Sequence, residues 1–170
     1  MPKALPFGLL EFAFGKLPPF VGWQAMTVGL RLAGVQMGKT SLFWGMPRLT
    51  GPGDVVSRLR IGEACGFNFG CHFELDGEIT FANDVSVGHE VLFLTRTYDE
   101  NDGHRRGQVS GARPIRVESG AWLGARSVIL PGVTIGAGSV IAASVVVREN
   151  VAPNTLLTGN RKISIAKWRA

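Results

Sequence analysis

The sequence is poor in charge and in the residues that bind metals or form cross-links. Of its 170 residues, 18% are charged and 45% are hydrophobic, with one tyrosine, two cysteines and three histidines. So little charge beside so much apolar content argues against a disordered chain. Two cysteines make no disulfide framework, and the histidines, His72, His89 and His104, lack the close pair that a zinc site uses. We therefore expect one globular domain, no metal, and a reducing, cytoplasmic setting.

No uncharged run of the N-terminal region is long enough to cross a bilayer. The N-terminal region is apolar, but charged residues divide it, and its longest uncharged run, residues 17–30, contains two prolines. No small-residue cleavage site follows a basic start, so we expect no cleaved signal peptide. We interpret residues 1–38 as an N-terminal segment of one or two short helices that docks on the body of the protein or on a neighbouring subunit. The alternative is peripheral membrane contact by residues 5–35 through an apolar face made of Phe7, Leu10, Phe14, Phe20, Trp23 and Leu30.

The formal net charge is +5 and the pI is about 9.8, which favours an anionic partner. The basic residues form no long run, and no aromatic-rich basic strand of the RNA-binding type is present, so we expect no nucleic-acid partner. A membrane surface and a phosphate-bearing ligand both remain consistent with this charge.

Aliphatic residues recur at every sixth position in the C-terminal half, at Val117, Leu123, Ile129, Ile135, Ile141 and Val147. The fifth residue of each unit is small or β-branched. The same spacing appears upstream at Val55, Ile61, Phe67 and Phe73 and, after a two-residue offset within "ELDGEIT", at Phe81, Val87 and Phe93. A period of six predicts short strands joined by tight turns in a solenoid of three-sided coils. A β-sandwich, with period-two strands, does not account for this spacing.

The repeat also places individual residues. Cys65 and Cys71 occupy its small interior position, which predicts buried free thiols, and His89 falls at a corner, where a solvated turn histidine is expected. Glycines after the aliphatic position are expected to ease the bends of the backbone, at Gly62, Gly88, Gly124 and Gly136. Residues 96–114 carry no repeat, so we predict a loop extruded from the solenoid, where binding and chemistry commonly reside.

Three segments carry a family resemblance: "PIRVESGAWLGARSVILPGVTIGAGSVIAASVVV" (114–147), "VAPNTLLTGN" (151–160) and "IGEACGFNFGCHFELDGEITFANDVSVGHEVLFLT" (61–95). They resemble the hexapeptide-repeat acyltransferases, and most of all the galactoside and maltose O-acetyltransferase branch and the colanic acid acetyltransferase type. The resemblance implies an all-β solenoid, a left-handed parallel β-helix with a short N-terminal helical segment and one extruded loop. The implied divisions are residues 1–38, a β-helix domain at 39–160 with the loop at 96–114, and a tail at 161–170.

The resemblance also implies a reaction. The family transfers an acetyl group from acetyl-CoA to a hydroxyl or amine, in clefts between the subunits of a homotrimer, with a histidine at the start of the extruded loop as general base. For this chain it implies an O-acetyltransferase with acetyl-CoA as donor. The expected acceptor is a hydroxyl of a saccharide or saccharide-lipid in surface polysaccharide biosynthesis. Such an acceptor would suit a protein that makes peripheral contact with the inner face of the membrane. The rival class is a trimeric protein that binds a ligand or acts as a scaffold without catalysis.

The family's acceptor-binding residues map onto Asn68 in "FNFGC" and Asp76 in "ELDGE", but its histidine maps onto Tyr98 in "TRTYD". A phenol is a poor base at neutral pH, so three explanations stay open. His104 in the same loop supplies the imidazole, or Tyr98 acts with Asp99 or Asp76 in a slower transfer. In the third, the protein binds a CoA-like or saccharide ligand without catalysis.

The donor side matches the family better. Trp122 corresponds to the family tryptophan beside the cleft, and Ala125 and Ala142 stand where backbone groups bond to the pantetheine arm. Arg148 stands where a basic residue meets the nucleotide phosphates. Near the C-terminus, "GNRKISI" departs from the family's usual ending, and it offers Arg161 and Lys162 to the 3′-phosphate.

Overall fold

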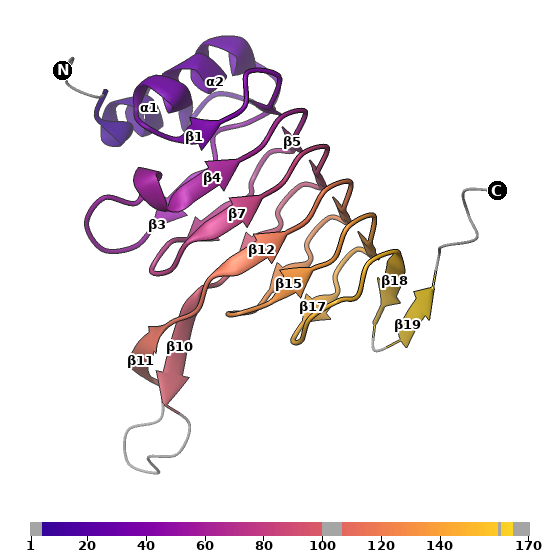
Figure 1. The fold of residues 1–170 in the computed structure, drawn as a ribbon. Coiled ribbons are helices and arrows are strands. Elements are labelled where there is room, and N and C mark those ends of the chain that lie inside the picture. The colour runs from indigo at the N-terminus through magenta and orange to yellow at the C-terminus, as the bar shows by residue number, and fades with distance from the viewer. Residues whose placement is uncertain (1–4, 100–106, 160, 165–170) are drawn as a thin grey trace.

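The structure, a computed structural model, describes residues 5–99, 107–159 and 161–164, and its body is a left-handed parallel β-helix (Figure 1). The predicted solenoid is thereby confirmed. Residues 18 apart stack in neighbouring coils, as in the pairs Trp122 with Val140 and Val128 with Val146. The chain visits the three sheets in turn, so each coil contributes one short strand to each sheet.

Three sheets form the sides of the coil, and their strands follow in spatial order. The first sheet contains β1 (Gln36–Met37), β4 (Leu59–Ile61), β7 (Ile79–Phe81), β12 (Ile115–Val117) and β15 (Thr134–Ile135). The second contains β2 (Leu42–Phe43), β5 (Gly66–Phe67), β8 (Ser86–Val87), β13 (Trp122–Leu123), β16 (Val140–Ile141), β18 (Thr155–Thr158) and, antiparallel to β18, β19 (Arg161–Ser164). The third contains β3 (Arg48–Thr50), β6 (His72–Glu74), β9 (Leu92–Phe93), β14 (Val128–Ile129) and β17 (Val146–Val147).

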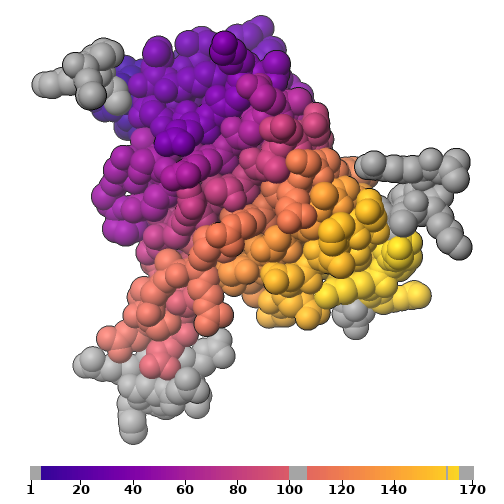
Figure 2. Space-filling view, viewed as in Figure 1, coloured from indigo at the N-terminus to yellow at the C-terminus, as the bar shows by residue number. Residues whose placement is uncertain are grey.

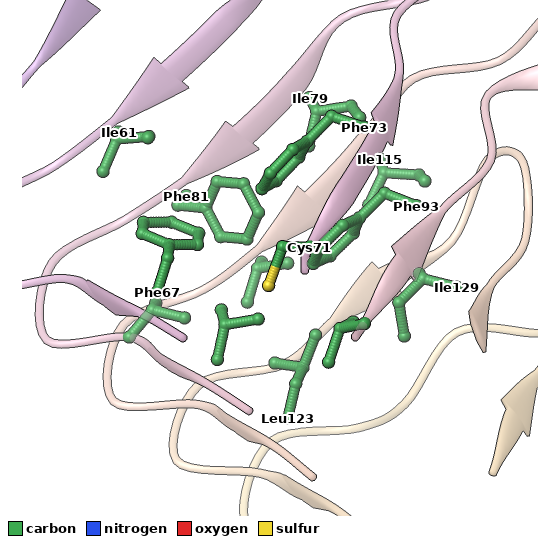
Figure 3. Packing of buried hydrophobic residues seen from close by; sticks show 14 of the residues in the cluster. Ile61, Phe67, Cys71, Phe73, Ile79, Phe81, Phe93, Ile115, Leu123 and Ile129 are labelled. Atoms are coloured by element: carbon green, nitrogen blue, oxygen red, sulfur yellow. The ribbon is translucent and has the colours of Figure 1, made fainter. Parts of the chain in front are cut away.

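The interior of the coils is filled by the residues that the six-residue spacing selects. All six aliphatics of the series from Val117 to Val147 are buried, and toward the N-terminus phenylalanines take their place (Figure 3). The rings of Phe73 and Phe93 stack in parallel at 5.0 Å between centroids. Cys65 and Cys71 are buried free thiols, as predicted, and burial raises the pKa of Cys71 to about 12, which keeps it protonated.

The repeat departs from the sequence prediction at Val55. Val55 was expected to continue the interior series, but it lies half-buried in the connection that leads into a 3₁₀ helix, η1 (Val56–Arg58). The turn at Gly51-Pro52-Gly53 takes the chain out of the coil there, because Gly53 adopts a left-handed φ of 62° and proline lacks the donor that a sheet ladder needs.

The repeat glycines were expected to ease the bends of the backbone, but they allow close packing between coils instead. A Cβ added at Gly88 would lie 2.6 Å from the Ala125 backbone nitrogen, and one at Gly124 would lie 2.6 Å from that of Ala143. Left-handed turn conformations fall on other positions, among them Glu90 and Arg126. Glycine is therefore needed where one coil touches the backbone of the next.

The N-terminal segment forms two helices, α1 (Phe7–Phe14) and α2 (Trp23–Leu32), that cover the first coil (Figure 1). Leu10 and Leu30 are buried in the same core as the coils, and the Phe43 backbone N–H donates to the Thr27 hydroxyl at 3.3 Å. Docking on the body is thus confirmed, and it uses part of the face that was considered for a membrane. Of the predicted face, only Phe20 is among the large apolar side chains left exposed in this segment. The full set of those exposed side chains is Leu9, Phe12, Leu17, Phe20, Val21, Val28 and Leu32. Within the described residues, neither helix is long and apolar enough to cross a membrane.

The predicted extruded loop is confirmed as an antiparallel hairpin, β10 (Arg96–Asp99) and β11 (Gln108–Ala112), which we call the arm. It leaves the coil after β9 and returns to β12, and it stands out from the body (Figures 1 and 2). The register of the hairpin shifts between Thr97 and Tyr98, where a bulge re-aims the strand.

Candidate functional site

Two edges of the triangular coil border the third sheet, and the predicted site residues divide between them. We call one the Asn68 corner, formed by the turns at residues 68–71, 88–91, 124–127 and 142–145. We call the other the Tyr98 corner, formed by the turns at residues 75–78, 130–133 and 148–150 and by the connection at 94–114 that carries the arm.

A cleft of about 560 Å³ opens at the base of the arm on the Tyr98 corner. Tyr98 and Arg148 both line it, so two residues chosen from the sequence, one for acceptor chemistry and one for phosphate binding, share one space. The rest of the lining consists of Glu74, Leu94, Arg96, Thr97, Ser110, Arg113, Leu130 and Pro131. Arg113 and Arg148 keep the cleft electropositive although Glu74 also lines it and Arg96 is paired with Asp76, and this charge suits an anionic ligand.

Arg96 organises the floor of this cleft. Its guanidinium donates to both carboxylate oxygens of Asp76, with Nε to Oδ1 and Nη2 to Oδ2 each at 3.1 Å, and its backbone N–H donates to Glu74 Oε2 at 3.0 Å. The hydrogen bond to Asp76 is the main reason why the pKa of Arg96 lies above its usual value, and the Tyr98 hydroxyl adds to it. Asp76, predicted to hold the acceptor, is therefore engaged in a bidentate ion pair that anchors the arm.

Tyr98 projects from the arm with 47% of its surface exposed, and Asp99 follows it at the end of β10. The structure thus connects Asp76 and Tyr98 through Arg96 at the base of the arm, whereas Asp99 lies at the outer end of β10. His104, the candidate imidazole of the loop, lies outside the described residues.

The Asn68 corner has a low profile. Its turns carry Gly88, Gly124, Ala125 and Ala142, and consecutive coils approach closely enough that the two glycines leave no room for a Cβ. Trp122 lies in β13 just before this corner and is 56% exposed, so it is not core filling. An extended chain can lie along such a surface and reach backbone donors and acceptors, with an aromatic wall beside it.

Further along the same corner, aromatic and charged side chains stand on successive coils. The ring of Phe69, next to Asn68, stacks on the ring of His89 at 5.4 Å between centroids and an interplanar angle of 11°. Arg126 Nε donates to Glu90 Oε2 at 2.5 Å. That hydrogen bond, with the positive charge of Arg126, lowers the pKa of Glu90 and keeps it ionised.

The C-terminal basic residues are not part of the cleft lining, but one of them reaches the last turn of the Tyr98 corner. Arg161 and Lys162 belong to the exposed strand β19, and Lys162 Nζ lies 3.0 Å from Glu149 Oε1. Part of the positive charge assigned to a phosphate is thus already paired.

Within the described part of the chain, the cleft lining includes none of Asn68, Trp122, Ala125 and Ala142. The predicted site residues of one protomer therefore lie in two groups on separate corners. Reasoning from the sequence missed Glu74, Arg96 and Arg113, and the only signal for them was their position beside the two irregular stretches, "ELDGE" and residues 96–114.

Comparisons with known proteins agree with this fold. Residues 114–149 match the family model described as bacterial transferase hexapeptide (six repeats). A hexapeptide-repeat acetyltransferase from Vibrio cholerae has a solved structure that matches with a TM-score of 0.79 and 25% identity, covering 93% of this chain and 88% of that one. A maltose O-acetyltransferase from Clostridium difficile has the same fold, with a TM-score of 0.72, 23% identity, and coverage of 92% and 82%.

Relatives in sequence include a Schizosaccharomyces pombe protein that carries an acetyltransferase name, 37% identical over 114 residues, which are 67% of this chain and 55% of that protein. Galactoside O-acetyltransferase of Escherichia coli is 29% identical over 103 residues, 61% of this chain and 51% of the enzyme. The chain spans about half the length of these relatives. The resemblance to hexapeptide-repeat acyltransferases is confirmed.

Proposed function

We propose that this hexapeptide-repeat protein is an O-acetyltransferase that moves an acetyl group from acetyl-CoA to a hydroxyl of a saccharide or saccharide-lipid, in a cleft between protomers of a homotrimer. The observation that carries the proposal is the pair of half-sites: an electropositive cleft with Tyr98 and Arg148 on one corner, and a low, glycine-lined ridge beside Trp122 on the other. Three protomers packed about an axis parallel to the coil bring the Tyr98 corner of one against the Asn68 corner of the next.

Acetyl-CoA fits the two half-sites by its chemistry. The pantetheine arm is long, thin and rich in amides, which suits the backbone groups beside Ala125 and Ala142, where no large side chain intervenes. Its phosphates suit the guanidinium of Arg148, and Arg161 extends the basic surface. The names of the galactoside and maltose O-acetyltransferases among similar proteins support a sugar hydroxyl as the acceptor.

Titration calorimetry with CoA tests the donor half. Wild-type protein is expected to bind, and Arg148→Ala to weaken binding about 10-fold or more, because a charge-assisted hydrogen bond contributes about 1.5–3 kcal/mol. Arg116→Ala is the matched control, since Arg116 is exposed on β12 outside the cleft. Wild-type protein that does not bind millimolar CoA contradicts the proposal. Light scattering in solution reports separately on the trimer.

Turnover with acetyl-CoA and a panel of sugars tests the reaction, with release of the CoA thiol as readout. Tyr98 at the expected base position and the pairing of Asp76 with Arg96 favour one rival, a trimer that binds its ligand without catalysis. Binding of CoA with no transfer to any acceptor supports that rival. If Tyr98→Phe loses turnover and His104→Ala retains it, the phenol of Tyr98 takes a direct part in the transfer. If His104→Ala loses turnover and Tyr98→Phe retains it, His104 takes that part.

A further inference from the structure

The residue that accepts the proton from the acceptor hydroxyl is unassigned, and the fold offers a histidine away from the extruded loop. His72 is on the flat third sheet, where a ring nitrogen and the Thr50 hydroxyl lie 2.8 Å apart. His89 stands on the Asn68 corner, half-buried. It is therefore the described histidine that lies on the edge where the pantetheine arm is proposed to run.

Backbone hydrogen bonds fix the level of His89 along that edge. Its turn is bonded to the turn below, because the Glu90 N–H donates to the Phe69 carbonyl at 3.0 Å. It is bonded to the turn above, because the Arg126 N–H donates to the His89 carbonyl at 2.9 Å. Neighbouring coils are about 5 Å apart. His89 therefore stands one coil from Asn68, on the proposed acceptor side, and one coil from Ala125, on the proposed donor side.

The imidazole is also held in place and left available. It stacks on the Phe69 ring, and Gly88 before it has no side chain to cover it. Glu90 and Arg126 pair with each other at 2.5 Å, so that carboxylate is already engaged. Among the residues that the structure describes, no side-chain hydrogen bond occupies a ring nitrogen of His89.

We infer that His89 is the general base of the acetyl transfer, acting in the intersubunit groove opposite the Tyr98 corner of the neighbouring protomer; this rests on the proposed function. A ring nitrogen takes the proton from the acceptor hydroxyl as its oxygen forms a bond to the thioester carbonyl carbon. The tetrahedral intermediate then collapses with cleavage of the C–S bond, and the leaving thiolate takes the proton back from the imidazolium. The products are the acetyl ester, CoA thiol and neutral His89.

The charged groups around His89 suit this role. Glu90 on the same turn and Arg126 on the coil above carry opposite charges that pair with each other. Phe69 and Asn68 on the coil below carry no charge. Tyr98, on the neighbouring protomer's facing corner, then orients the acceptor without having to ionise.

The first test is turnover by the full chain with acetyl-CoA and the best sugar of the panel. His89→Gln is expected to lower kcat by about 10²- to 10⁴-fold, the usual contribution of a general base, with little change in CoA affinity. It is also expected to remove the acidic limb of the pH profile between about pH 5 and 8, where imidazoles titrate. His72→Gln is the matched control and is expected to turn over like the wild type at pH 7.5. Full activity of His89→Gln, or loss confined to His104→Ala, overturns the assignment.

A second readout does not need turnover. Diethyl pyrocarbonate modifies accessible imidazoles, and peptide mass spectrometry locates the adduct. CoA is expected to protect His89 several-fold and to leave His72 unchanged. Binding of CoA without protection of His89 overturns this inference and leaves the proposed function standing, whereas absence of CoA binding overturns both.

Discussion

Replacing Phe73 by alanine is expected to separate the N-terminal coils from the rest of the solenoid. Its side chain has no exposed surface, and its ring lies 5.0 Å from that of Phe93, 5.9 Å from Phe67, 6.1 Å from Phe81 and 6.2 Å from Phe43. Truncation of a buried phenylalanine costs about 3–5 kcal/mol, and the lost ring contacts put this site toward the upper end of that range. Since its partners belong to the first, second and third coils, the loss weakens the interfaces between coils as well as one position.

Denaturant unfolding at a fixed protein concentration measures this effect, because assembly shifts apparent stability with concentration. The free energy of unfolding is expected to fall by about 4 kcal/mol for Phe73→Ala, with faster amide exchange in β2, β5 and β6 than in β16. Phe12→Ala is the matched control, since Phe12 is 84% exposed on α1, and it is expected to stay within about 0.5 kcal/mol of wild type. A loss below about 1 kcal/mol for Phe73→Ala would refute the account of the aromatic core.

Three further outcomes are expected. Gly124→Ala places a Cβ 2.6 Å from a backbone nitrogen and should destabilise the fold by about 1–3 kcal/mol in thermal unfolding. Gly8 in α1 has open space around it, so Gly8→Ala should be neutral or slightly stabilising. Equal effects of the two substitutions would contradict the close-packing role of Gly124. Burial, followed by the charge of Arg48, lowers the pKa of His72, so the unfolded chain takes up the proton at a higher pH than the folded chain does. The melting temperature should therefore decline as the pH falls below about 6.5, and it should decline less in His72→Gln. An identical pH dependence in that variant would exclude the effect. Asp76→Asn breaks the bidentate pair with Arg96 and should speed amide exchange in the arm but not in β16; unchanged exchange would show that the pair does not anchor the arm.

The period of the sequence predicts the coil because interior positions are set by local spacing. Each hexapeptide places one aliphatic residue inside the coil independently of its neighbours. The burial of the series from Val117 to Val147 can therefore be predicted without reference to the rest of the chain. Val55 misled for the same reason: it keeps the spacing, but the turn at residues 51–53 removes it from the coil, and spacing alone carries no information about that departure.

The site was less predictable because its contacts cross insertions. Phe69 and His89 stack although they are 20 residues apart, since the extra residues in "ELDGE" shift the register from 18. Glu90 and Arg126 pair across one coil at a separation of 36 because the arm lies between them. Arg96 reaches Asp76 only through the geometry at the base of that arm. Family resemblance predicts roles for Tyr98 and Arg148, and both line the cleft, but their neighbours there depend on where the coil is interrupted.

Both ends of the coil carry an element that covers part of the exposed strand edges. A stack of parallel strands presents unpaired amides and carbonyls at each terminus, a template on which further copies would add into a fibre. Here α2 lies over the first coil, and β19 folds back across β18 in the opposite direction, with Arg161 and Lys162 on the outermost strand. β19 thereby covers the β18 edge of the second sheet, an edge that a further copy of the chain would otherwise be able to extend.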